Sequence, residues 1–522
     1  MTVNHEDVFQ TGGIFRAANG HIFQRAVQIR ACFEYPLIKR MPSFRPAGQH
    51  KQGKTDITLI EAMAPLVTMF LAFVIGGLFV PIGAEFLIMA LLLSAAVAAI
   101  FAGKYNHGWK DIQRAAGQKI SGALPAIIIL LSIGMLIGTW MFSGTIPMLV
   151  YYGIKVINPQ YMIFTAFLVT AAMSLTGSSW ASVGTIGVAL MGVATAIGAP
   201  LPATAGAVIS GAFFGDKLSP LSDSTNVNAL AAGANLYDHI RSMLYTAVPS
   251  FVIALFVYFF AGTFIDIDTT YADPSNNPIL AELDQIYNFS WWLAIPPLIV
   301  IISTFKRFEA AFAMVISSIS AMLIGILVQD FSLNNALLSA ITGFKTTMIN
   351  GDIAEHSAML QMLLNRGGAY AMSNTIVIII TAFILAGAMD VSGGLTKLLE
   401  TMLNYVKSTF SLIGATMVSS ATMIGLTSHG SVTALIVGGL FQDTYKENGM
   451  APEVLSRSME DSSTLLEPLM PWTVTGMYMA TTVGVSTIEY APWAIFCVTG
   501  SLFSLLLAAT HKYTGFGLKQ LK

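Results

Sequence analysis

Long apolar windows, separated by short polar segments, recur along most of the chain. Clear examples are residues 57–80, 120–141, 243–261, 310–328, 369–389 and 491–509. Each is close to the roughly 20 residues that an α-helix needs to cross a hydrocarbon core of about 30 Å. The pattern predicts an all-α, polytopic membrane protein with roughly 10–12 spans.

Composition and charge agree with a membrane protein. Of the 522 residues, 55% are hydrophobic and 10% are charged, whereas about 25% of residues are charged in ordinary soluble domains. The formal net charge of −2 gives no reason to expect nucleic-acid binding. Cys32 and Cys497 are the only cysteines, which are too few and too far apart to form a metal site or a disulfide framework.

The distribution of charged residues predicts the orientation and the domain organisation. Residues 1–55 are rich in Arg and Lys, whereas residues 263–288 carry several Asp and Glu but no Lys or Arg. Because basic loops stay inside, we expect a cytoplasmic N-terminal tail (1–55) and an external acidic loop (263–288). Between and after these segments lie a first transmembrane half (56–262) and a second one (289–522).

Each half contains an apolar segment that small and hydroxyl residues interrupt, at 175–180 in the first half and at 426–431 in the second. Each interruption is followed by a charged segment with proline, at 216–226 and at 460–472. Paired interruptions at corresponding positions are typical of inverted-repeat transporters that bind their substrate near the membrane midplane. We therefore expect two inverted-repeat halves with broken or re-entrant helices.

The interrupted segments offer the chemistry of an ion site. Free carbonyls with hydroxyl, amide and carboxylate oxygens suit Na+, and half-helix N-termini suit a carboxylate. A buried Asp can also exchange a proton for a cation, because desolvation favours its neutral form and a bound cation favours its charged form. The candidate ion or substrate ligands are Thr176, Gly177, Ser178, Ser179, Asp216, Ser219, Ser222, Asp223, Thr225, Asn226, Thr427, Ser428, His429, Ser431, Asp461 and Glu467. The Na+ hypothesis assigns Asp216, Asp223, Thr225 and Asn226 as metal ligands.

Residues 176–180, 184–192 and 210–226 closely resemble the NhaC family of Na+/H+ antiporters, and residues 238–241 fit the continuation of that pattern. In the second half, residues 455–462 and 468–472 resemble the matching family segment. The resemblance covers the chain from about residue 56 onward. It implies a secondary active Na+/H+ antiporter in the bacterial cytoplasmic (inner) membrane, with Na+ and H+ as its partners and no cofactor.

The second interruption departs from the family pattern. Several members carry an acidic residue, a Gln and an aromatic residue there, whereas this chain has His429, Gly430 and Ser431. Glu467 is a candidate to replace the missing charge. Related NhaC-like carriers exchange malate, lactate or amino acids, so the alternative function is a Na+/H+-coupled exchanger of a small organic acid or amino acid. Structural interpretations stay open for Asp223, as a helix N-cap, and for His429, as a hydrogen-bonding group at the break.

Other classes of protein have less support. The sequence contains no P-loop, no His-Glu-x-x-His and no Cys-x-x-Cys motif, so we do not expect an enzyme. A channel is a further alternative, because broken helices also line pores; saturation and counterflow distinguish a carrier from it. A homo-oligomer is compatible with the sequence, which does not determine the oligomeric state.

Overall fold

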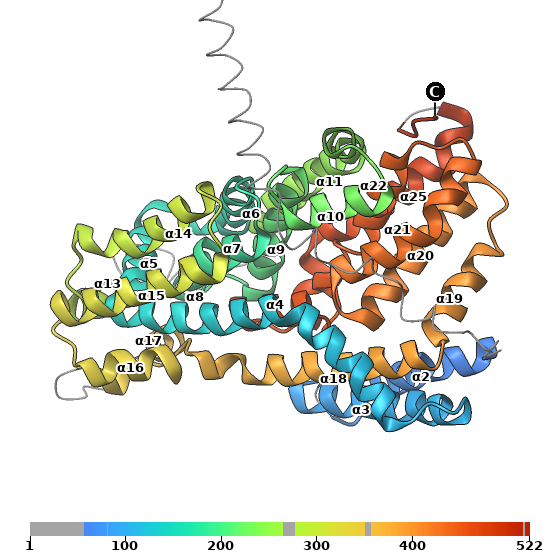
Figure 1. Cartoon of the computed structure of the whole chain (residues 1–522). Coiled ribbons are helices and arrows are strands. Elements are labelled where there is room, and N and C mark those ends of the chain that lie inside the picture. Colours follow the sequence, from blue (N-terminus) through green and yellow to red (C-terminus); the bar gives the residue numbers. More distant parts are fainter. Residues whose placement is uncertain (1–56, 81, 265–276, 350–356, 515–516, 522) are drawn as a thin grey trace, which may run out of the picture. The chain divides into compact units, whose positions relative to one another are not determined.

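The computed structural model describes residues 57–80, 82–264, 277–349, 357–514 and 517–521 (Figure 1). Within these ranges the chain is helical, without strands, apart from turns and one isolated bridge between Met450 and Gln520. Eight described helices are long and apolar enough to cross a membrane, or up to eleven spans if each of three strongly bent helix pairs counts as one. The all-α, polytopic prediction is confirmed. The tail at 1–55 and most of the acidic loop, residues 265–276, lie outside the described residues.

The helices of the first half are α2 (Leu59–Leu71), α3 (Ala84–Lys104), α4 (Trp109–Ser143), α5 (Thr145–Val156), α6 (Met162–Ser174), α7 (Ser179–Ser182), α8 (Val188–Ala196), α9 (Leu201–Leu218), α10 (Asp223–Ala232) and α11 (Leu236–Phe264). Those that follow are α13 (Pro278–Ile286), α14 (Ile295–Phe305), α15 (Ala310–Leu327), α16 (Leu333–Ile341), α17 (Ala358–Leu364), α18 (Ser373–Val391), α19 (Gly394–Leu403), α20 (Thr409–Thr427), α21 (Gly430–Glu447), α22 (Pro452–Ser462), α23 (Val474–Val483), α24 (Thr487–Tyr490) and α25 (Ile495–Thr514).

The helices α4 and α18 pack against each other and run in opposite directions (Figure 1). Each is covered by a helix from the other half, because α3 packs along α18 and α15 packs along α4. Opposite directions and this exchanged packing agree with two halves of inverted topology.

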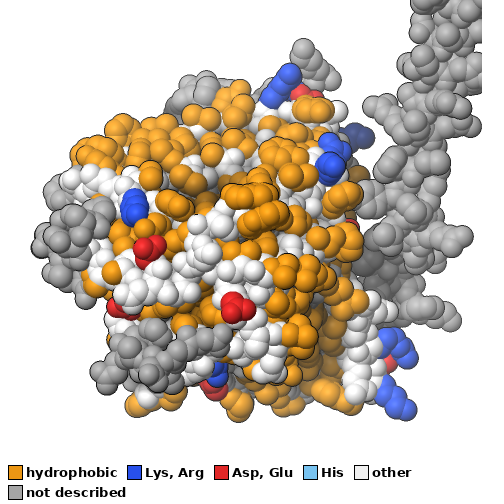
Figure 2. Space-filling view, turned by 90° about the vertical axis from the view of Figure 1, so that its left-hand side faces the viewer, with side chains coloured by type: hydrophobic (Ala, Val, Ile, Leu, Met, Phe, Trp, Pro, Cys, Tyr) orange, Lys and Arg blue, Asp and Glu red, His pale blue; other side chains and the backbone are white. Residues whose placement is uncertain are grey.

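The outer surface is apolar. Hydrophobic side chains cover most of the face in Figure 2, and charged side chains on it are few and scattered. Phe312 and Leu327 of α15 are 60% and 81% exposed. An extensive apolar surface of this kind is stable against lipid but not against water.

Both interruptions predicted from the sequence are breaks between helices. The first lies between α6 and α7, where Gly177 has φ +102° and the side chain of Ser178 caps α7. The second lies between α20 and α21, where Ser428 has φ +56° and His429 is the extended N-cap residue. The two breaks expose helix ends inside the bundle, where side chains or a ligand must replace the missing backbone partners.

Candidate functional site

The first break lies directly against the turn between α9 and α10. A Cβ at position 177 would approach the Cβ of Leu221 to 2.6 Å, so both the space and the positive φ require glycine there. Ser178 accepts the N–H of Ala181 at 3.1 Å. The hydroxyl of Ser179 then donates to Oδ2 of Asp216, at the end of α9, at 3.2 Å. The break therefore positions the hydroxyl of Ser179 to donate a hydrogen bond to the carboxylate of Asp216.

Asp216 is only 6% exposed and has oxygen atoms around it. Ser224 Oγ lies 3.5 Å from its Oδ2, and Ser222 Oγ lies 3.0 Å from Ser224 Oγ. The hydroxyl of Thr225 lies 3.4 Å from the carbonyl oxygen of Asp216. A carboxylate among hydroxyl and carbonyl oxygens has the hard ligands that an alkali cation prefers.

The other two residues of the Na+ hypothesis lie differently. Asp223, the first residue of α10, is exposed, and the cap of that helix is Ser222. The exposed Asn226 donates from its amide to the carbonyls of Pro220 at 3.0 Å and Ser222 at 2.7 Å, which closes the turn. The structure brings Asp216 and Thr225 together and leaves Asp223 and Asn226 at the surface of this segment. Ser219 is buried in the same turn, and its Oγ accepts the N–H of Leu221 at 3.3 Å.

The second break lies against Glu467. Thr475 donates its hydroxyl to Glu467 Oε1 at 2.7 Å, and a Cβ at Gly430 would lie 2.9 Å from Oε2. The buried carboxylate of Glu467 thus faces the first turn of α21. Nδ1 of His429 is buried and has no hydrogen-bond partner among the residues described. The imidazole makes no capping bond to α21.

The hydroxyl groups around the second break mostly bond locally. Thr427 and Thr433 share a hydrogen bond of 2.8 Å, whereas the buried hydroxyl of Ser428 has no partner within the described ranges. Ser431 is half-buried in the first turn of α21. Thr176, at the first break, donates to the carbonyl of Met173 at 2.8 Å.

The two breaks are related by one constant shift in residue number. In the first half the residues are Thr176, Asp216, Ser224 and Gly233. In the second half Thr427, Glu467, Thr475 and Gly484 follow one another at the same intervals. Gly233 and Gly484 end α10 and α23 with φ of 70° and 73°. A hydroxyl of the next helix approaches the carboxylate in both halves. Glu467 is therefore the second-half counterpart of Asp216.

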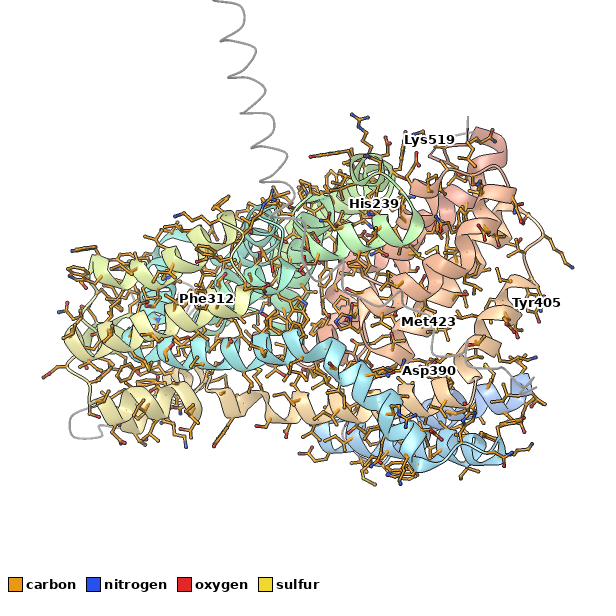
Figure 3. All side chains as sticks on the ribbon, viewed as in Figure 1. His239, Phe312, Asp390, Tyr405, Met423 and Lys519 are labelled. Atoms are coloured by element: carbon orange, nitrogen blue, oxygen red, sulfur yellow. The ribbon has the colours of Figure 1, made fainter. Side chains whose placement is uncertain are left out.

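Sequence reasoning missed a group of buried ion pairs between the halves. Lys217 of α9 pairs with Asp461 of α22, and both side chains are at most 1% exposed. His239 of α11 (labelled in Figure 3) contacts Glu460 Oε2 at 2.8 Å through Nε2. Asp461 was a candidate ligand, but Lys217, His239 and Glu460 were not. The high density of charged residues within 453–461 was a sign of these ion pairs. The sequence alone does not show that this segment packs against α9 and α11.

These ion pairs distinguish two kinds of buried carboxylate. Asp461 and Glu460 have basic partners, whereas Asp216 and Glu467 form no ion pair with any described Lys, Arg or His. Thr225 contacts one residue of each kind, because its hydroxyl is near the backbone carbonyl of Asp216 and is also 3.4 Å from Glu460 Oε1. No group of three or more His, Cys, Asp or Glu with metal-site geometry occurs in the described ranges. Asp216 and Glu467 are thus the buried acids that hydroxyls, not cations, surround.

Paired helix breaks and buried carboxylates within a bundle of apolar spans define a polytopic, helical membrane transporter. A family model described as "Na+/H+ antiporter family" matches residues 57–241 and 211–511. The chain belongs to the Na+/H+ antiporter family.

Three relatives are similar over most of their length. A Haemophilus influenzae protein named as an uncharacterized Na+/H+ antiporter is 42% identical over 89% of this chain and 98% of its own. The Na+/H+ antiporter NhaC of Bacillus subtilis is 34% identical over 81% and 92%. The malate-2H+/Na+-lactate antiporter of Bacillus subtilis is 31% identical over 86% and 95%.

Proposed function

We propose that this protein is a secondary active transporter that exchanges Na+ for H+ at the carboxylate of Asp216. One observation carries the proposal: Asp216 is buried beside a helix break, contacts hydroxyl oxygens, and has no ion-pair partner among the described residues. An isolated buried carboxylate is costly unless a proton or a cation neutralises it. Such a group binds either ligand but not both.

The exchange follows from this competition. With Na+ bound, Asp216 supplies the negative charge, and Ser179 and Ser224 supply oxygens that replace part of the hydration shell. When Na+ leaves, burial favours the neutral carboxyl group, which then carries a proton. Alternation of the site between the two membrane sides couples the two gradients. The proposal includes no enzymatic activity and no cofactor.

A second candidate function is Na+/H+-coupled exchange of a small organic acid or amino acid. The unpartnered Nδ1 of His429 at the second break favours it, because a protonated imidazole can hold a carboxylate. The similarity to the malate-2H+/Na+-lactate antiporter also supports it.

Proteoliposomes with an enclosed pH dye separate these functions. External pulses of Na+, Li+ and K+ are compared with and without malate, lactate and amino acids. We expect Na+ to raise the luminal pH in the absence of any organic acid, because H+ leaves as Na+ enters. An exchange that requires an organic acid would favour the second candidate, and no saturation with Na+ would favour a channel.

We further propose the bacterial cytoplasmic membrane as the location, with the tail at 1–55 inside and the loop at 263–288 outside. In intact cells, a cysteine at Asn276, a position outside the described residues, should react with an impermeant maleimide. A cysteine at Gln113, exposed near the start of α4, should be protected. Labelling of Gln113→Cys and protection of Asn276→Cys would reverse the orientation.

A further inference from the structure

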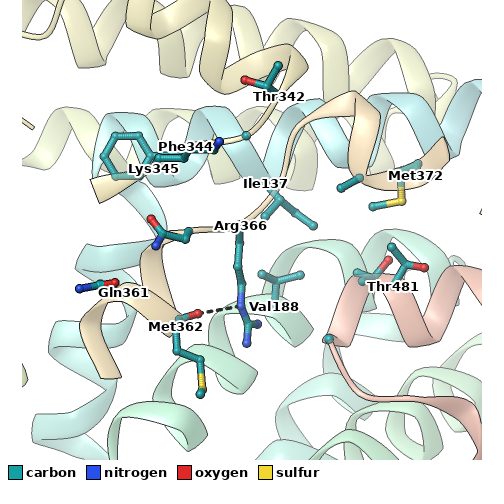
Figure 4. A pocket seen from close by; sticks show the side chains of 16 residues that line it. Ile137, Val188, Thr342, Phe344, Lys345, Gln361, Met362, Arg366, Met372 and Thr481 are labelled. Atoms are coloured by element: carbon teal, nitrogen blue, oxygen red, sulfur yellow. Dashed lines mark hydrogen bonds between the residues drawn. The ribbon is translucent and has the colours of Figure 1, made fainter. Parts of the chain in front are cut away.

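A cavity of about 630 Å³ lies apart from the two breaks (Figure 4). The first half contributes Ile137 of α4 and Val188 of α8 to its wall. The later part of the chain contributes residues 342–345, the loop after α17, and the C-terminal end of α23. Neither Asp216 nor Glu467 lines this cavity. Its volume is in the range of about 300–1,000 Å³ that small-molecule sites occupy.

Arg366 lines this cavity and lies near the centre of the view in Figure 4. Its Nε donates to the carbonyl of Met362 at 3.2 Å, and its two Nη groups form no hydrogen bond or ion pair with the described residues. Burial lowers the pKa of the Arg366 guanidinium, and no carboxylate of the described residues offsets this effect. Arg366 is half-buried, and a partly desolvated cation without an anionic partner among the described residues is stabilised when an anion binds beside it.

The loop that carries Arg366 is held rigidly against α4. The N–H of Phe344 donates to the carbonyl of Arg366 at 3.2 Å, and the N–H of Gly368 donates to the carbonyl of Gly134 at 2.6 Å. A Cβ at Gly367, whose φ is +84°, would lie 2.2 Å from the backbone nitrogen of Gly138. Close backbone packing therefore fixes the part of the loop from which the Arg366 side chain extends.

A second polar group in the wall lacks a partner. Thr482 of α23 is 3% exposed and lines the cavity, and its hydroxyl lies near that of Tyr478 but forms no hydrogen bond of normal geometry within the described part of the chain. A buried hydroxyl without a partner costs about 1–3 kcal/mol. The neighbouring Thr481 differs, because its hydroxyl is 2.9 Å from that of Thr375. Thr482 is thus available to a ligand.

We propose that this cavity binds a small organic carboxylate. Arg366 would hold the carboxylate through its Nη groups, Thr482 would donate to or accept from a second oxygen of the ligand, and the exposed Lys345 would attract the anion at the rim. Apolar Ile137 and Val188 suit a carbon skeleton more than inorganic phosphate. The inference goes beyond Na+/H+ exchange and does not rest on it, because binding needs no ion gradient.

Calorimetric titration of the purified full-length protein with choline L-malate and choline L-lactate tests the site. We expect saturable binding of at least one acid. Arg366→Gln should weaken it at least about tenfold, as expected for loss of a charge-assisted pair. Arg114→Gln, which removes a 74% exposed cation from the start of α4, should bind like the wild type. Thr482→Val should weaken binding about fivefold.

The Thr482→Val variant separates a ligand role from a structural one. If the hydroxyl serves only the fold, removal of an unsatisfied polar group leaves affinity unchanged and the melting temperature equal or higher. Lower affinity with an unchanged melting temperature supports the proposal even if Arg366→Gln does not fold. The proposal would be overturned by absence of binding to both acids, or by wild-type affinity in Arg366→Gln. Saturable binding of inorganic phosphate alone, added as its choline salt, would also overturn it. Malate or lactate binding without Na+-driven exchange would refute the proposed function and leave this site intact.

Discussion

The two helix breaks share a backbone plan but not a chemistry. In the first half, Ser179 donates to Asp216, and in the second half the equivalent position is Gly430, which has no side chain to offer Glu467. Ser178 of the first break corresponds to His429 of the second. The first break therefore surrounds its carboxylate with several hydroxyls, whereas the carboxylate at the second break accepts from the hydroxyl of Thr475 and lies against Gly430. The two breaks thus share their geometry and differ in single side chains.

The same comparison applies one residue further along. Lys217 follows Asp216 and pairs with Asp461, whereas Pro468 follows Glu467 and has no charge. The first break is consequently attached to the opposite half through a buried ion pair.

The largest expected effect comes from removing the first carboxylate. Asp216→Asn should reduce Na+-driven H+ exchange at least about 100-fold, because an amide neither titrates nor carries the charge that holds Na+. Luminal pH measurements in proteoliposomes test this. Matched protein content and an unchanged melting temperature show that the variant is folded. Exchange at the wild-type rate would remove Asp216 from the site.

Removal of the second carboxylate should have a smaller effect. Glu467→Gln retains an oxygen that can accept from Thr475 and should lower the apparent Na+ affinity about tenfold, roughly 1.4 kcal/mol, because an amide cannot ionise when a cation enters the bundle. Exchange rates across a range of Na+ concentrations provide the measurement. A loss as complete as that of Asp216→Asn would show that the two breaks act as equals.

The hydroxyl of Ser179, which the second break lacks, should contribute less to the apparent Na+ affinity than either carboxylate. Ser179→Ala removes one donor to Asp216 and should weaken apparent Na+ affinity about fivefold, near 1 kcal/mol. Thr475→Val, which removes the hydroxyl that donates to Glu467, should have a smaller effect. The reverse order of these two variants would assign the cation to the second break.

The smallest effect is expected at Asp223. Asp223→Asn should change the initial exchange rate less than about twofold, because the side chain is exposed and Ser222 caps α10. The rate is measured under the conditions used for Asp216→Asn. Loss of exchange in a folded Asp223→Asn protein would identify Asp223 as a ligand that becomes enclosed during the transport cycle.

The sequence predicted most of the fold because lipid permits few solutions. Apolar windows of span length must be helices, and glycine, proline and hydroxyl residues within them must mark breaks. The register between the breaks was present in the sequence, since Thr176 to Asp216 and Thr427 to Glu467 are equal intervals, but it was overlooked. The pairing of His239 with Glu460 was not predictable. It depends on how α11 meets α22, which no local pattern encodes.

The exchanged packing of α3 and α18 has a consequence for biosynthesis. Leu87, Leu91 and Ala95 of α3 are buried in one cluster with Ile378 and Ala382 of α18. The ribosome completes α3 at Lys104 and reaches α18 only at Ser373. The α2–α3 hairpin must therefore remain in the bilayer without its permanent neighbour while most of the chain is still being made. A nascent chain arrested before Ser373 should expose this face to lipid and to the cell's quality control.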